Sequence, residues 1–216
     1  INALNMIDGM DGLAGGQALV ATGWFAVAAA NTPHVHEFQV ACSLTGLLLA
    51  FLVFNARFPG RRRALVFMGD AGSHLLGLVL AWLAIRLSMH EHPAFAPVTA
   101  VWILGIPLAD SVALLLRRSL SGRNPFRADR THLHHLLQQS CNFGHGRVSS
   151  VLFAASLVMG GIGYLGHRAG VPERLMFYAY GALWIAYCAI TWHASRTLDM
   201  ARMRGLSSGR EVLTHS

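Results

Sequence analysis

The sequence contains no lysine and few charged residues of any kind. Only 12% of its 216 residues are charged, whereas 54% are hydrophobic, a balance that argues against a water-soluble domain. All 17 basic residues are arginine, and they cluster between apolar stretches instead of along one polar face. This distribution follows the positive-inside rule of membrane proteins. It excludes a nucleic-acid-binding domain, which needs a continuous basic surface.

Cysteine is also scarce. Only three are present, and no two of them form a CxxC pair. Cys42 and Cys188 fall in apolar stretches and Cys141 in a basic one, so the sequence predicts no disulfide framework. We interpret all three as small apolar residues with free thiols.

Long apolar stretches make up most of the remaining sequence. Each is about 17 to 20 residues long, close to the length that a helix needs to cross a bilayer. Open strands are excluded there, because lipid cannot satisfy their backbone hydrogen bonds. We therefore predict an all-α polytopic transmembrane bundle, with a kink at Pro107 in the fourth span. The six predicted spans are residues 13–30, 38–54, 72–89, 97–116, 148–166 and 175–193.

The arginines give this bundle an orientation. Most of them lie in the segments 57–63, 117–147 and 196–210, which alternate with connections that are nearly free of arginine. The positive-inside rule therefore places both ends of the chain in the cytoplasm. We predict a transmembrane domain at 1–194, with a cytoplasmic Arg/His loop at 117–147. A basic cytoplasmic tail at 195–216 is expected to be a partly disordered arm at the inner leaflet.

The acidic residues gather at the rim of the predicted membrane region. Asn5, Asp8 and Asp11 recur every three residues just before the first span, and Asp70 stands at the start of the third. Because a carboxylate is costly in hydrocarbon, acids in these places are functional candidates. The small neighbours of Asp70 leave room for a phosphate, and its carboxylate suits Mg²⁺. The alternative for Asp11 and Asp70 is a helix N-cap.

The Arg/His loop carries the other polar candidates. Arg130 is followed by His132, His134 and His135, a set of donors suited to a diphosphate. A zinc site and an amphipathic helix on the membrane surface are the alternatives. Asp110, inside the fourth span, is expected to have a structural role, with an arginine or a freed backbone group as its partner.

Three motifs together resemble one known superfamily. Residues 5–14 read Asn-Xaa-Xaa-Asp-Gly-Xaa-Asp-Gly-Leu-Ala, residues 67–73 Phe-Met-Gly-Asp-Ala-Gly-Ser, and residues 129–135 Asp-Arg-Thr-His-Leu-His-His. In this order they are similar to the polyprenyl-phosphate N-acetylhexosamine-1-phosphate transferases. The last motif most resembles the bacterial undecaprenyl-phosphate N-acetylglucosamine-1-phosphate transferases. The similarity covers nearly all of residues 1–200.

The resemblance implies a reaction and the groups that serve it. The reaction is transfer of N-acetylglucosamine 1-phosphate from its UDP donor to undecaprenyl phosphate, with release of UMP, as the first membrane step of O-antigen or related polysaccharide synthesis. The cofactor is Mg²⁺, or else Mn²⁺, and the place is the cytoplasmic face of the bacterial inner membrane. The implied roles are metal binding by Asn5 and Asp70, catalysis by Asp70 and Asp8, nucleotide binding by Asp8 and Asp11, and diphosphate binding by Arg130, His132, His134 and His135.

Several alternatives stay open. The donor could be another UDP-N-acetylhexosamine, or the product a lipid intermediate of peptidoglycan synthesis. A cation transporter subunit is a more remote possibility, because it would need acids spread through the depth of the membrane. The paired aspartates of the superfamily would precede Ile1, so we expect the N-terminal helices to be missing and the 216-residue chain alone to be inactive.

Overall fold

The computed structural model describes residues 1–57, 61, 63–120, 138 and 143–214, and over these residues it is helical, without strands. This confirms the predicted all-α class. The helices are α1 (Asn2–Ile7), α2 (Leu13–Ala29), α3 (Val35–Asn55), α4 (Gly69–Ser88), α5 (Pro97–Ile103), α6 (Gly105–Leu120), α8 (His145–Arg168) and α9 (Glu173–Thr214).

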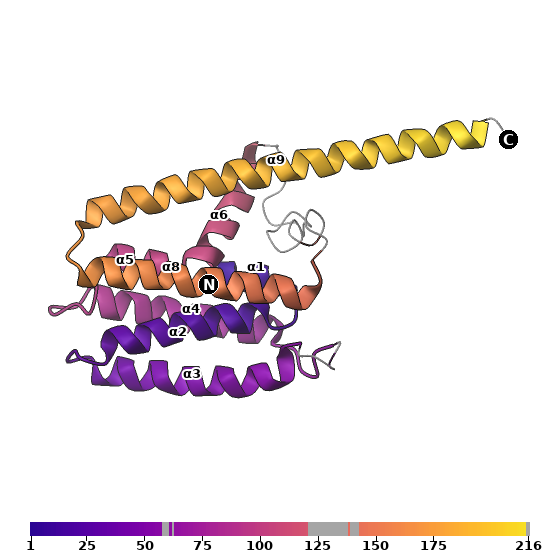
Figure 1. The fold of residues 1–216 in the computed structure, drawn as a ribbon. Coiled ribbons are helices and arrows are strands. Elements are labelled where there is room, and N and C mark those ends of the chain that lie inside the picture. Colours follow the sequence, from indigo (N-terminus) through magenta and orange to yellow (C-terminus); the bar gives the residue numbers. More distant parts are fainter. Residues whose placement is uncertain (58–60, 62, 121–137, 139–142, 215–216) are drawn as a thin grey trace.

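The short helix α2 is the centre of the bundle. It packs against α3, α8 and α4, whereas α1 packs on α4 and α6 (Figure 1). Alanine and glycine line much of α2, and small side chains let helices approach closely in a membrane. The same rule operates on α8. A methyl group at Gly160 would overlap the ring of Trp24, and one at Gly163 would overlap Trp102.

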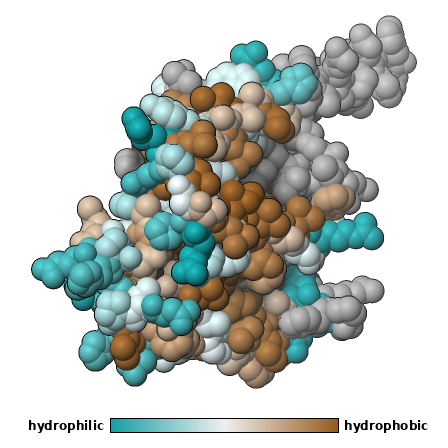
Figure 2. Space-filling view, turned by 60° about the vertical axis from the view of Figure 1, so that its left-hand side comes forward, coloured by the Kyte–Doolittle hydropathy of each residue, from teal (hydrophilic) through white to brown (hydrophobic). Residues whose placement is uncertain are grey.

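Length and composition support most of the predicted spans. Four helices are long and apolar enough to cross a membrane, namely α3, α4, α8 and the Glu173–Ala194 part of α9, and α5 with α6 could form a fifth. α2 is apolar but has only 17 residues. Figure 2 shows apolar side chains across the middle of the visible face, with polar side chains to either side. The first predicted span, 13–30, which corresponds to α2, and the cytoplasmic placement of the chain ends stay predictions.

The fourth predicted span is broken, and not where the sequence suggested. α5 ends at Ile103 and α6 starts at Gly105, at an angle of 83°. Pro107 is therefore the third residue of α6 instead of a kink within one helix. The first turn of a helix has no internal partners for its N–H groups, so proline costs little at this position.

The C-terminal arm is also ordered differently from the prediction. α9 continues without interruption through Thr214, so residues 195–214 of the basic tail form the end of a long helix (Figure 1). No proline occurs after Pro172, and alanine, arginine, leucine and methionine favour helix, whereas the glycines at 205 and 209 are only weak breakers. These residues are therefore helical in the structure, whereas the sequence suggested a partly disordered arm.

Candidate active site

The first and second motifs meet where α1 ends and α4 begins. Asn5 lies on α1 and Asp8 is the residue that ends it, while Asp70 lies in the first turn of α4. The Ser73 hydroxyl donates to the side-chain oxygen of Asn5 at 2.8 Å and also contacts the backbone oxygen of Asp70 at 3.1 Å. Two residues predicted to hold one metal are thus linked through one serine.

Asp8 and Asp70 are electrostatically coupled. Burial, followed by the negative charge of Asp70, raises the pKa of Asp8 from 3.8 to about 6. No salt bridge joins either carboxylate to a basic group within the described ranges. Two neighbouring acids without such a cation form an environment that attracts one from solution.

Asp11 has a different environment. Its carboxylate accepts a hydrogen bond from Arg57 Nε at 2.7 Å and another from the Ala64 backbone N–H at 3.1 Å. Burial opposes ionisation, but these hydrogen bonds and the charges of Arg57 and His145 lower the pKa of Asp11. Asp11 is therefore a charged residue held in a fixed position.

The helix-cap alternative fails for both acids. Gly12 is the N-cap of α2, with a φ of 78° that favours glycine, and Met68 is the N-cap of α4; neither helix has a side-chain cap hydrogen bond. Asp11 precedes the cap of α2, and Asp70 lies beyond the cap of α4.

Three residues that build the site were missed in the sequence. Buried Asn55, at the end of α3, accepts a hydrogen bond from the Gly12 N–H at 2.9 Å and donates to the Val66 carbonyl at 2.8 Å. It therefore joins the first motif to the loop before the second. Arg57 and Ser73 are the other two. The sequence did contain a signal for Asn55 and Arg57. Asn55 is a polar residue at the end of an apolar span, and Arg57 follows it by two positions.

The donor set suits a magnesium ion better than a zinc ion. Within the described ranges, no group of three or more His, Cys, Asp or Glu side chains could hold a metal. Asn5, Asp8 and Asp70 offer one amide and two carboxylates, all oxygen donors. Mg²⁺ usually takes one or two carboxylates and completes its shell with water and phosphate oxygens, so these residues fit it.

The remaining predicted site residues cannot be placed. Arg130, His132, His134 and His135 lie outside the described residues, and so does Cys141. The Arg/His loop is entered from α6, which is held by α9. Trp184 donates to the Ala109 carbonyl at 3.2 Å, and Tyr187 donates to the buried Asp110 carboxylate at 2.7 Å.

Asp110 thus makes the kind of structural contact that was expected of it, and one of its partners is the hydroxyl of Tyr187. The series of polar contacts between α9 and α6 continues one helix turn before Trp184, where the Tyr180 hydroxyl donates to the Gly105 carbonyl at 3.1 Å. These contacts supply polar partners to α6 beside the helix break, where Pro107 has removed a donor.

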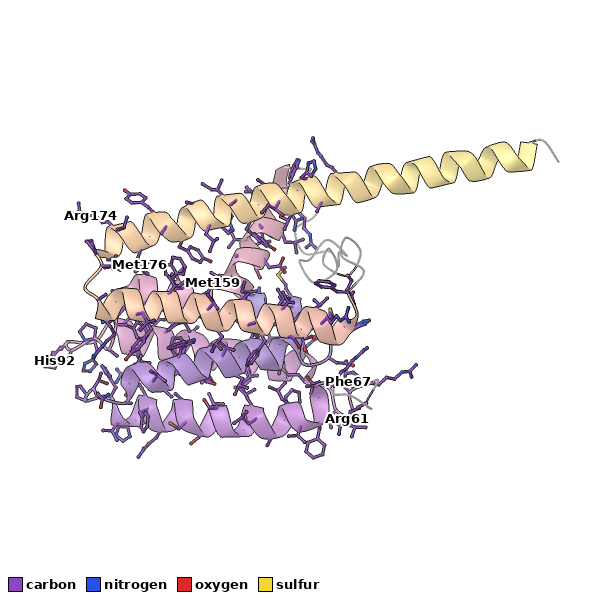
Figure 3. All side chains as sticks on the ribbon, viewed as in Figure 1. Arg61, Phe67, His92, Met159, Arg174 and Met176 are labelled. Carbon is purple, nitrogen blue, oxygen red and sulfur yellow. The ribbon has the colours of Figure 1, made fainter. Side chains whose placement is uncertain are left out.

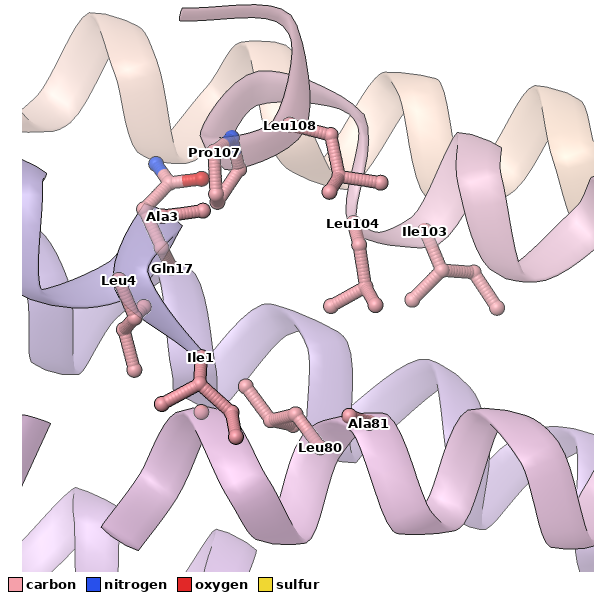
Figure 4. A pocket seen from close by; sticks show the side chains of 11 residues that line it. Ile1, Ala3, Leu4, Gln17, Leu80, Ala81, Ile103, Leu104, Pro107 and Leu108 are labelled. Atoms are coloured by element: carbon pink, nitrogen blue, oxygen red, sulfur yellow. The ribbon is translucent and has the colours of Figure 1, made fainter. Parts of the chain in front are cut away.

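An apolar cavity lies beside the first motif. Its volume is about 110 Å³, and it is bounded by α1, α2, α4 and the break between α5 and α6 (Figure 4). Gln17 reaches its wall; the side-chain oxygen accepts a hydrogen bond from Ser156, whereas the side-chain nitrogen has no partner within the described ranges. Ile1, Leu80 and Pro107 contribute to its otherwise apolar lining.

Comparison with known proteins agrees with this arrangement. Residues 1–88, which carry both described motifs, match the model of glycosyl transferase family 4. Over 94% of its length the chain is 32% identical to the undecaprenyl-phosphate alpha-N-acetylglucosaminyl 1-phosphate transferase of Yersinia pestis and 33% identical to that of Escherichia coli K12. The chain is a relative of these transferases. The resemblance seen in its motifs is confirmed.

The similarity extends to other bacteria but covers only part of each relative. The transferase of the same name from Pasteurella multocida is 35% identical over 73% of the chain, which corresponds to 44% of that protein. The chain spans 56% of the Yersinia and Escherichia proteins. A multi-pass membrane protein is consistent with these relatives and with the helices described above.

Proposed function

We propose that the protein containing this chain transfers N-acetylglucosamine 1-phosphate from UDP-N-acetylglucosamine to undecaprenyl phosphate and releases UMP. The observation that carries the proposal is the meeting of Asn5, Asp8 and Asp70 at adjoining helix ends, with the pKa of Asp8 raised beside Asp70. Such a site suits a cation that binds phosphates. The names of the related transferases supply the lipid and the sugar.

The described residues have distinct parts in this reaction. A bound Mg²⁺ would neutralise diphosphate charge as the phosphoryl bond breaks. Asn5 and Asp70 hold the metal, Asp8 adds negative charge beside them, and Ser73 fixes the amide of Asn5. Asp11, held by Arg57 and the Ala64 N–H, presents a fixed acceptor edge to the nucleotide. Positioning of this kind supplies much of the rate in phosphoryl transfer.

The Arg/His loop completes the proposed site. Arg130, His132, His134 and His135 donate to the donor's diphosphate, since arginine and histidine make charge-assisted hydrogen bonds to phosphate oxygens. The site faces the cytoplasm of the bacterial inner membrane, where the arginine-rich connections lie. The product then enters O-antigen or a related cell-surface polysaccharide.

The proposal is tested with the complete protein in membrane vesicles. The vesicles are given undecaprenyl phosphate and a panel of UDP-sugars, and both UMP and the lipid-linked product are measured. We expect UMP release only with UDP-N-acetylglucosamine among the donors, and only when Mg²⁺ or Mn²⁺ is present. Release with another UDP-N-acetylhexosamine would replace the sugar and keep the chemistry. Release unaffected by EDTA would overturn the metal role of Asn5 and Asp70.

A further inference from the structure

The helix α9 contacts α6 through polar side chains on one of its faces. Tyr180, Trp184 and Tyr187 are four and three residues apart, so they lie on the same side of α9. Each donates a hydrogen bond to an acceptor in the first two turns of α6, namely the Gly105 carbonyl, the Ala109 carbonyl and the buried Asp110 carboxylate. α9 therefore fixes the part of α6 that directly follows the helix break.

The direction of α6 depends on such contacts, because α6 does not continue the axis of α5. Only Leu104 separates the two helices, which meet at 83°. At the start of α6 the backbone lies close to α8 and α9. A methyl group at Gly105 would overlap the end of Met159 and touch the ring of Tyr180. Neighbouring helices therefore place α6, since no rigid helical connection to α5 does so.

The helix α1 depends on α6 in turn. It has six residues and no side-chain cap, so it is too short to be stable by itself. It packs on α4 and on α6. From the side of α4, the Ser73 hydroxyl donates to Asn5, and α6 supplies the other support. Because α1 carries Asn5 and ends at Asp8, a shift of α6 would move both residues relative to Asp70 on α4.

We propose that Trp184 and Tyr187 are positioning residues for the metal site. They hold α6 against α1 and so set where Asn5 and Asp8 lie relative to Asp70. Both act through α6, since their acceptors belong to that helix. Mg²⁺ requires nearly ideal octahedral geometry, so a small displacement of its oxygen donors weakens binding. This inference rests on the metal role that the proposed function gives to Asn5 and Asp70.

The test measures Mn²⁺ binding to the complete protein in detergent without substrates, so its result does not depend on activity. Electron paramagnetic resonance of free Mn²⁺ gives the affinity. The double variant Trp184→Phe/Tyr187→Phe removes both hydrogen-bond donors and keeps two aromatic rings on α9. We expect it to bind Mn²⁺ about tenfold more weakly than the wild type, because two hydrogen bonds that fix α6 are lost. Equal affinity in a folded double variant would overturn the proposal.

Two controls separate positioning from a general loss of stability. Arg86→Ala removes the cation of buried Glu37 and should lower the unfolding temperature, but it should leave Mn²⁺ affinity unchanged, because this pair joins α3 to α4 without α6. Tyr178→Phe, exposed on α9, should change neither quantity. Equal weakening of Mn²⁺ binding by Arg86→Ala would overturn the proposal. If the double variant does not fold, Tyr187→Phe decides alone, with a several-fold weakening expected and unchanged affinity contradicting the proposal.

Hydrogen exchange shows where the variant acts. Peptides from α1 and α6 should exchange several-fold faster in the double variant, whereas α3 should keep its wild-type protection. Faster exchange confined to α9 would overturn the proposal, because α1 would then be held without it. The wild type distinguishes this failure from that of the proposed function. A wild type that binds no Mn²⁺ would overturn the metal role of Asn5 and Asp70 together with this inference. Binding that is equal in the wild type and the double variant would overturn this inference alone.

Discussion

The two ends of the bundle use acidic residues in opposite ways. At the end carrying His92, Glu37 is 4% exposed and accepts a hydrogen bond from Arg86 Nε at 2.9 Å, with His34 Nδ1 3.7 Å away. At the end carrying Arg61 and Phe67, Asp8 and Asp70 lie near each other instead (Figure 3). No salt bridge to either is found within the described ranges.

Glu37 has the contacts of a structural residue, whereas Asp8 and Asp70 have those expected of functional residues. Glu37 ties α3 to α4 through Arg86, and His34 adds a hydrogen-bonding contact with the His92 backbone oxygen at 2.8 Å. That set is complete without a ligand. Burial and the charge of Asp70 raise the pKa of Asp8, so a bound cation would stabilise the ionised form of Asp8. The partner of an acid, more than its burial, indicates its role.

The largest effect should follow loss of Asp70. We expect Asp70→Ala in the complete protein to lower UMP release about a hundredfold or more, because stabilisation of charge in the transition state is lost. Insertion into the membrane should be unaffected, since the side chain of Asp70 is exposed. The measurement is turnover per folded protein in membranes.

Glu37→Gln is the matched control for this prediction. It also removes one carboxylate from the first turn of a helix, but at the opposite end of the bundle. We expect its turnover per folded molecule to match that of the wild type. A hundredfold loss in Glu37→Gln as well would mean that loss of an acid at either end of the bundle affects turnover, and the distinction between the two ends would fail.

The next effect concerns stability at the Glu37 end and depends on which partner is removed. Arg86→Ala leaves a buried carboxylate without its cation and should cost about 3 kcal/mol of unfolding free energy. Glu37→Gln leaves Arg86, whose side chain is 47% exposed, and should cost about 1 kcal/mol. Thermal unfolding in detergent measures both. Equal losses of unfolding free energy in Arg86→Ala and Glu37→Gln would show that water reaches the Glu37 carboxylate once Arg86 is removed.

A smaller effect is expected where α9 holds α6. Tyr187→Phe removes the hydroxyl that donates to Asp110 and should lower the unfolding free energy by about 1 to 2 kcal/mol, because a buried acceptor loses a partner. Tyr178→Phe, on the same helix but 69% exposed, is the control and should have no measurable effect. Equal unfolding temperatures for the two variants would show that the Tyr187 bond contributes nothing.

Much of this arrangement could be predicted from the sequence. The helical class and most spans followed from the length of the apolar stretches, and the position of Asp70 at the start of a helix followed from its motif. The break before Gly105 could not be predicted, because a proline at 107 fits equally a kinked helix and the first turn of a new one. Only the packing of α5 and α6 distinguishes them.

Only part of the candidate site could be predicted from the sequence. Local spacing placed Asn5, Asp8 and Asp11 on one segment, but their partners come from distant positions. The link from Ser73 to Asn5 and the pairing of Arg57 with Asp11 join residues 68 and 46 positions apart. Helical periodicity describes neighbours within about four residues and carries no information at such separations.

The smallest expected effect is on the pH dependence of stability in Asp8→Asn. It tests directly whether the surroundings of Asp8 raise its pKa. The pKa of Asp8 in the folded protein, about 6, is above its ordinary value of 3.8, so the folded state binds the proton more tightly than the unfolded state. This contribution to stability is fully present below pH 4 and is lost as the pH rises through 6. Asparagine cannot ionise, so Asp8→Asn should gain stability relative to wild type over that interval.

The measurement is the unfolding temperature of both proteins in detergent with EDTA, between pH 4 and pH 8. The difference between Asp8→Asn and wild type should grow by a few degrees between pH 4 and about pH 7 and then stay constant. Adding Mg²⁺ at pH 8 should stabilise the wild type more than the variant, because the cation favours the ionised carboxylate. A difference that does not change with pH would show that Asp8 is solvated, and one that falls with rising pH would show that a basic group pairs with it. In either case Asp8 would resemble Glu37 or a surface acid, and the contrast between the two ends would rest on Asp70 alone.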